Sequence, residues 1–113
     1  MLGFSNWRSL ERLAVGDLPK YGDIQAVYAM RSKHGALLYI GSTGNLRRRI
    51  FGNYLGGVGG ETTKRVNRLL FSAGAVADIE VAWIETVVYR EKERELKELC
   101  RDQLGGLPHW TKL

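Results

Sequence analysis

The chain has 113 residues, of which 44% are hydrophobic and 26% are charged, and this composition is typical of a globular protein rather than a disordered one. No apolar run approaches the roughly 20 residues that a membrane-spanning helix needs, and charges among the first apolar residues exclude a secretory signal. The formal net charge of +5 favours a polyanionic partner, although many small basic proteins bind no nucleic acid. The single cysteine, Cys100, excludes an internal disulfide and a multi-cysteine zinc site, so we expect a protein of the reducing cytoplasm.

The apolar pattern predicts a sequence of short elements along the chain. The chain should begin with a helix over about 6–14, with Trp7, Leu10 and Leu13 on one side, and a turn through 16–22. A hairpin should follow, with a strand over 24–31, a loop at 32–35 and a strand over 36–41. The remaining expected elements are a helix from 44 or 45 to 54, a glycine loop at 56–60, a helix over 62–73, a strand over 79–87 and a helix over 89–104. The last helix should stop at the glycine pair that follows it.

This order of elements favours a mixed α/β (α+β) fold, with a small, mainly antiparallel three-stranded sheet flanked by helices. The length is that of one domain, so we expect a single unit over 1–113. In it, 1–22 would be an N-terminal helix and lead-in, and 23–113 the core.

Two tyrosine motifs lie on the two strands of the expected hairpin. They read Ala26-Val27-Tyr28 and Tyr39-Ile40-Gly41, and Arg49 follows eight residues after the motif glycine, on the next helix. Together with the long closing helix, they resemble the GIY-YIG nuclease superfamily over about 24–111. The second motif is intact, whereas the first has alanine and valine in place of glycine and isoleucine.

The resemblance implies a DNA endonuclease that hydrolyses phosphodiester bonds with a divalent metal, Mg²⁺ (or Mn²⁺). It implies that Tyr28 and Tyr39 activate or position the nucleophile, that Arg49 grips the phosphate, and that a glutamate of the last helix binds the metal. Magnesium often uses only one or two protein carboxylates, so one well-placed glutamate is sufficient. Which tyrosine acts as the general base stays open.

The best candidate for the metal ligand is Glu93. Helical periodicity puts it inside the apolar face of the last helix, where an isolated carboxylate is costly unless a charge or a metal compensates it. The family spacing, with an apolar residue three positions later, also selects Glu93. The alternative is an ordinary charged helix with Glu93 at the edge of that face, paired with Arg94 or Lys97.

Further residues are candidates for DNA contacts or supporting roles. Lys64, Arg65 and Arg68 form a cationic side of the helix over 62–73, and Arg47 lies on one flank of the preceding helix. We expect these residues to contact DNA, and the alternative is that they form an ordinary solvated surface. The resemblance adds three supporting candidates. Asn53, followed by Tyr54, lies four residues after Arg49, where many relatives have histidine or tyrosine, and Thr111 lies where asparagine is usual. His34 is a lone histidine of the hairpin loop that could contact the substrate.

The main alternative function is a non-catalytic nucleic-acid-binding module that retains the fold. With few residues outside the resemblance, we expect targeting to come from the glycine loop, a second copy of the chain or a partner protein, or else specificity to be weak. A composite active site also makes a geometric prediction. Tyr28 should pair opposite Tyr39 across an even loop without a bulge, and Arg49 and Glu93 should converge on the face that both tyrosines share.

Overall fold

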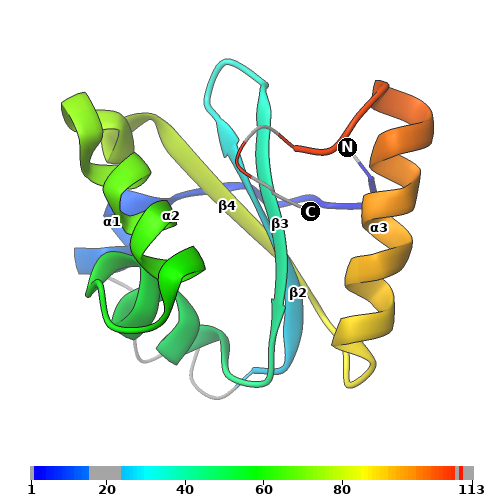
Figure 1. Cartoon of the computed structure of the whole chain (residues 1–113), viewed down its shortest axis with the longest axis horizontal. Helices are drawn as coiled ribbons and strands as arrows, with labels where there is room; N and C mark the ends of the chain where they lie inside the picture. The colour runs from blue at the N-terminus through cyan, green and yellow to red at the C-terminus, as the bar shows by residue number, and fades with distance from the viewer. Residues whose placement is uncertain (1, 16–23, 109, 111–113) are drawn as a thin grey trace.

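The computed structural model describes residues 2–15, 24–108 and 110, which form an antiparallel sheet with helices on both faces (Figure 1). The elements in chain order are β1 (Arg8–Ser9), α1 (Leu10–Val15), β2 (Ala26–Ser32), β3 (Leu37–Thr43), the π-helix η2 (Arg48–Leu55), α2 (Glu61–Phe71), the 3-10 helix η3 (Ser72–Asp78), β4 (Ile79–Glu85) and α3 (Tyr89–Leu104). The mixed α/β class is confirmed. The sheet has four strands in the order β1-β4-β2-β3, because β1 adds a strand that the sequence did not predict.

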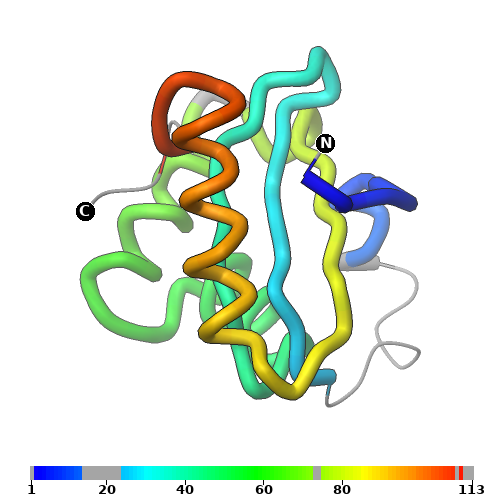
Figure 2. Tube along the Cα trace, turned by 90° about the vertical axis from the view of Figure 1, so that its right-hand side faces the viewer, coloured from blue at the N-terminus to red at the C-terminus, as the bar shows by residue number. Residues whose placement is uncertain are grey.

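Helices cover the two faces of the sheet unequally. Figure 1 shows α1 and α2 on one side and α3 alone on the other, and Figure 2 looks onto the side of α3. The buried core under α1, η2 and α2 includes Tyr28, Met30 and Ile50, whereas the core under α3 includes Val27 and Ile40. Since alternate residues of β2 point into different cores, both faces of this central strand are buried.

The N-terminal segment corrects the prediction of a helix over 6–14. Asn6 has a positive φ of 57°, which no right-handed helix allows, and the next residues pair as a strand with β4 before α1 begins at Leu10. The three residues expected on one side of that helix therefore pack into different cores. Trp7 packs against the core under α3, while Leu10 and Leu13 belong to the other core. The turn predicted at 16–22 lies outside the described residues.

The hairpin differs from the predicted register by two residues. Tyr28 pairs with Gly41 and Met30 pairs with Tyr39, and an irregularity between Met30 and Arg31 leaves Leu38 as an extra residue on β3. The prediction of a hairpin without a bulge is therefore wrong. A shift of two preserves the alternation of side chains, so the two motif tyrosines still point to the same face.

The remaining helices lie close to their predicted positions. The long helix α3 has the predicted bounds and ends at Gly105, whose φ of +80° is the left-handed cap expected of a glycine there. The helix predicted up to residue 54 is wound as a π-helix, a rare form that is frequent at functional sites. None of the helices within the described ranges is long and apolar enough to cross a membrane.

Candidate active site

Three tyrosines meet on the face of the sheet under η2. Tyr28 comes from β2, Tyr39 from β3 and Tyr54 from η2, and their ring centroids lie 5.9–6.2 Å apart. The hydroxyls of Tyr28 and Tyr54 are hydrogen-bonded to each other, and the Tyr54 hydroxyl donates to that of Tyr39 at 3.4 Å. We call these three residues the tyrosine cluster. Both motif tyrosines therefore belong to one hydrogen-bonded group.

Burial divides the tyrosine cluster into two inner members and an outer one. Tyr28 and Tyr54 are 1% and 2% exposed, whereas Tyr39 is only partly buried. Burial, reinforced by the neighbouring tyrosines, raises the pKa of Tyr28 well above its ordinary value, and the nearby Arg49 opposes this shift only weakly. Burial is also the main cause that raises the pKa of Tyr54. At neutral pH both inner hydroxyls are therefore protonated and act as hydrogen-bond donors.

The motif glycine, Gly41, is required by the close approach of the tyrosine cluster. A Cβ atom at this position would lie 2.5 Å from the Tyr28 hydroxyl oxygen and 2.9 Å from the Tyr39 ring. Tyr28 is fully buried, so its hydroxyl has little room to withdraw. The glycine thus allows the two tyrosines to pack over the backbone of β3.

Arg49 borders the tyrosine cluster from η2. Its guanidinium carbon lies 6.0 Å from the centroid of the Tyr54 ring, and the side chain is partly buried. Its Nε atom is buried and finds no hydrogen-bond partner within the described part of the chain. An unpaired buried donor costs about 1–3 kcal/mol and is rare in folded proteins. The adjacent Arg47 and Arg48 are both exposed.

Glu93 lies on the opposite face of the sheet from the tyrosine cluster. One oxygen of its partly buried carboxylate accepts a hydrogen bond from Ser42 Oγ at 2.5 Å, and the other pairs with Lys97 Nζ at 2.6 Å. Ser42 directly follows Gly41 on β3 and therefore points to the α3 side. The prediction that Glu93 converges with Arg49 on the tyrosine face is therefore wrong, and the Lys97 pairing left open by the sequence is present.

The groups around Glu93 fit a hard divalent cation in chemical type. The carboxylate and the Ser42 hydroxyl are oxygen ligands, the kind that magnesium prefers. No group of three or more histidine, cysteine, aspartate or glutamate side chains that could hold a metal occurs among the described residues. A cation bound here would therefore depend on Glu93, on water and on oxygens of the substrate.

Of the residues predicted to support the site, Asn53 has a structural role. Asn53 Nδ2 donates to the carbonyl of Val58 at 2.5 Å and so holds the glycine loop. Asn67, which the sequence did not single out, donates to the carbonyl of Tyr54 at 2.5 Å and fixes η2 to α2. His34 is exposed in the hairpin loop, and Thr111 lies outside the described residues.

The positive charges of α2 lie on its outer side. Lys64 and Arg68 are exposed and Arg65 is partly buried, while Val66 and Leu70 of the same helix are fully buried. The hydrogen bond of Asn67 links α2 to η2, the helix that carries Arg49. The cationic side is therefore mechanically tied to the tyrosine cluster.

Comparison with known proteins places the chain in a family. No curated protein matches it, but the family model described as the GIY-YIG catalytic domain matches residues 25–103. The matched range includes both tyrosine motifs, Arg49 and Glu93, whereas β1 and α1 lie before it. The chain therefore belongs to the GIY-YIG family, whose members are generally endonucleases that use divalent metal ions.

Proposed function

We propose that the protein is a divalent-metal-dependent DNA endonuclease that hydrolyses phosphodiester bonds. The observation that carries the proposal is the tyrosine cluster beside Arg49, whose buried Nε has no hydrogen-bond partner among the described residues. Hydrolysis of a phosphodiester needs a positioned water and a cation that faces the developing negative charge. Tyrosine hydroxyls can supply the first, and a guanidinium held against them can supply the second.

Each member of the tyrosine cluster takes a role that follows from its burial. Tyr39 is the member with exposed surface, so it is the one that can contact the attacking water. Tyr54 donates to the Tyr39 oxygen and holds it in place, and Tyr28 fixes Tyr54 in turn. The guanidinium of Arg49 can contact two phosphate oxygens at once.

The metal would be held by Glu93, with Ser42 beside it. When bound, a Mg²⁺ or Mn²⁺ ion supplies positive charge that neutralises the phosphate oxygens. Lys97 already occupies one carboxylate oxygen, so a cation that binds at that oxygen would displace or rearrange this ion pair. DNA would be held by Lys64, Arg65 and Arg68 on the outer side of α2 and by Arg47 directly before η2.

The proposal is tested by incubating the full chain with duplex, single-stranded, flap and junction DNA, in magnesium and in a chelator. We expect cleavage of at least one substrate in magnesium and none in the chelator. Arg49→Gln should lower the cleavage rate by roughly 10²–10³-fold, the usual cost of removing one preorganised donor to a transition state. The matched control is Arg48→Gln, an exposed neighbour with the same charge change, which should cleave at nearly the normal rate.

A non-catalytic nucleic-acid-binding module is the second candidate. The ion pair between Lys97 and Glu93 favours it, because it neutralises the carboxylate that a metal would need. This function predicts DNA binding with no product in magnesium or manganese on any substrate of the panel. Binding without cleavage would therefore replace the endonuclease proposal.

A further inference from the structure

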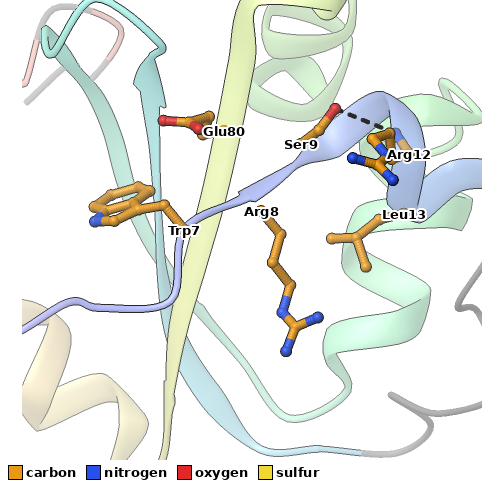
Figure 3. A pocket seen from close by; sticks show the side chains of 6 residues that line it. All are labelled: Trp7, Arg8, Ser9, Arg12, Leu13 and Glu80. Carbon is orange, nitrogen blue, oxygen red and sulfur yellow. Dashed lines mark hydrogen bonds between the residues drawn. The ribbon is translucent and has the colours of Figure 1, made fainter.

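The N-terminal segment, which lies outside the family match, builds a polar hollow at the β1 edge of the sheet. The hollow has a volume of about 440 Å³, and residues of β1, of α1 and of β4 line it: Trp7, Arg8, Ser9, Arg12, Leu13 and Glu80. Figure 3 shows Leu13 between the guanidinium groups of Arg8 and Arg12. A smaller hollow of about 130 Å³ adjoins Arg8 and is lined also by Ser5, Asn6 and Trp83. Arg8 therefore borders both hollows.

The charge of the hollow is suited to an anion. Among the described residues that line the hollow, the one carboxylate is Glu80, which accepts a hydrogen bond from Arg31 Nε at 2.9 Å, so its negative charge is compensated. The guanidinium carbon of Arg31 lies 4.3 Å from the centre of the Trp7 ring, so Arg31 covers one face of this ring. Arg8 and Arg12 are both exposed. Two arginines around a polar hollow favour a phosphate-bearing ligand over an apolar one or a stacked base.

Strand pairing relates this hollow to the tyrosine cluster. Arg8 pairs with Val81, Val81 pairs with Met30, and Met30 pairs with Tyr39, so the four residues form one row across the sheet. Paired residues share a face, which puts Arg8 on the same face as Tyr39 but at the opposite edge. Three strand intervals separate the edges, or about 14 Å. That span corresponds to about four base-pair steps measured along the axis of duplex DNA.

We infer that Arg8 and Arg12 form an accessory phosphate-binding site for the backbone of a DNA substrate, at the edge of the sheet remote from β3. The inference rests on the proposed function, since it assumes that DNA is the substrate. The site contacts the sugar-phosphate backbone without reading bases, and it gives the domain a second point of attachment. The N-terminal segment thereby contributes to affinity although it lies outside the matched catalytic domain.

The test is the salt dependence of binding of the full chain to a fluorescently labelled DNA duplex, followed by anisotropy. Arg12→Gln should lower the log–log slope by roughly 0.9, and adding Arg8→Gln should lower it by about as much again. Arg12 uses only its backbone N–H to bond Ser9 Oγ, so its side chain can be changed without breaking this contact. The matched control is Arg101→Gln, at an exposed position near the end of α3, which should leave the slope unchanged.

Arg8 lies over the Trp83 ring, so Arg8→Gln could destabilise β1. Thermal unfolding of the double variant is therefore measured as well. If the double variant is destabilised, the result for Arg12→Gln alone decides the test. An unchanged slope, or an equal change in the Arg101→Gln control, overturns the accessory site while leaving DNA binding intact. Amide shifts at the hollow in inorganic phosphate, with DNA affinity insensitive to Arg12→Gln, would instead identify a site for small anions and also overturn it. If the unaltered chain binds no DNA at all, the proposed function itself fails.

Discussion

Gly41 and Ser42 are neighbours on β3, yet they serve two regions built on different physical principles. On the side of Gly41, the tyrosine cluster is packed against buried apolar residues, and its inner hydroxyls are neutral. On the side of Ser42, the carboxylate of Glu93 and the ammonium of Lys97 are partly exposed and charged. The first region is fixed by close packing, whereas the second can exchange its partners.

This difference indicates how a composite site must work. The two regions are separated by the sheet itself and share only β3, which is an edge strand. A phosphate could contact both regions only around that edge, where the chain leaves β3 toward η2. The tyrosine cluster and Arg49 would form the permanent part of the site, and Glu93 the part that rearranges on binding a cation.

The largest expected effect tests whether the Glu93 region belongs to the site at all. Glu93→Ala should lower magnesium-dependent cleavage by at least about a hundredfold, because the bound cation would lose its carboxylate. Glu91→Ala is the matched control, because Glu91 is exposed in the first turn of the same helix. Its cleavage rate should stay near normal. Normal cleavage by both variants would show that the tyrosine cluster acts without the Glu93 region.

The second prediction tests the packing of the tyrosine cluster. Gly41→Ala should reduce the free energy of unfolding by about 1–3 kcal/mol, since the new methyl group would overlap the buried Tyr28 hydroxyl. Gly52→Ala is the control. Its Cβ would meet only the Arg48 side chain at 3.7 Å, and removing a helical glycine should stabilise the protein by roughly 0.5–1 kcal/mol. Urea unfolding of both variants measures the contrast, and equal effects would contradict the close approach at Gly41.

The elements that the sequence predicted well are those with strong local signals. The helix α3 has a long apolar period and a glycine that ends it, so both of its bounds were correct. The shared face of Tyr28 and Tyr39 was also correct, because parity survives a shift of two residues. The exact register was not, since the extra residue Leu38 depends on tertiary packing rather than on loop length.

The parts that were missed depend on contacts between distant segments. The strand β1 has only two residues and exists by pairing with β4, about 70 positions away along the chain, a distance at which local pattern is uninformative. The contact between Ser42 and Glu93 was missed in the same way. Its signal was available in the parity of β3, since a residue next to the motif glycine must point to the other face.

A smaller effect is expected from alkaline pH, through the inner members of the tyrosine cluster. Burial raises the pKa of Tyr28 and Tyr54 above 10.0, so above that pH they ionise in the unfolded chain first. Their contribution to stability is complete below pH 10 and is lost as the pH rises further, by about 1.4 kcal/mol per pH unit for each tyrosine.

Urea unfolding over a pH series detects this loss. The decline above pH 10 should be flatter in the double variant Tyr28→Phe, Tyr54→Phe than in the unaltered chain. Tyr89→Phe removes a tyrosine of α3 and leaves the tyrosine cluster whole, so the decline should keep its slope. A double variant that declines as steeply as the unaltered chain would show that the inner hydroxyls are not kept neutral by burial.

The smallest effect is expected at Lys97, and it distinguishes the exchangeable region from a fixed one. Lys97 and Glu93 are 29% and 25% exposed, so their ion pair is worth only about 0.2–1 kcal/mol. If a cation must displace Lys97 to reach Glu93, Lys97→Met should tighten Mn²⁺ binding by roughly two- to fivefold, as measured by titration calorimetry. Lys92→Met is the matched control, because it removes the same charge from a pair with Glu95 on the same helix. Equal affinities in all three proteins would mean that the ammonium and the cation do not compete for this carboxylate.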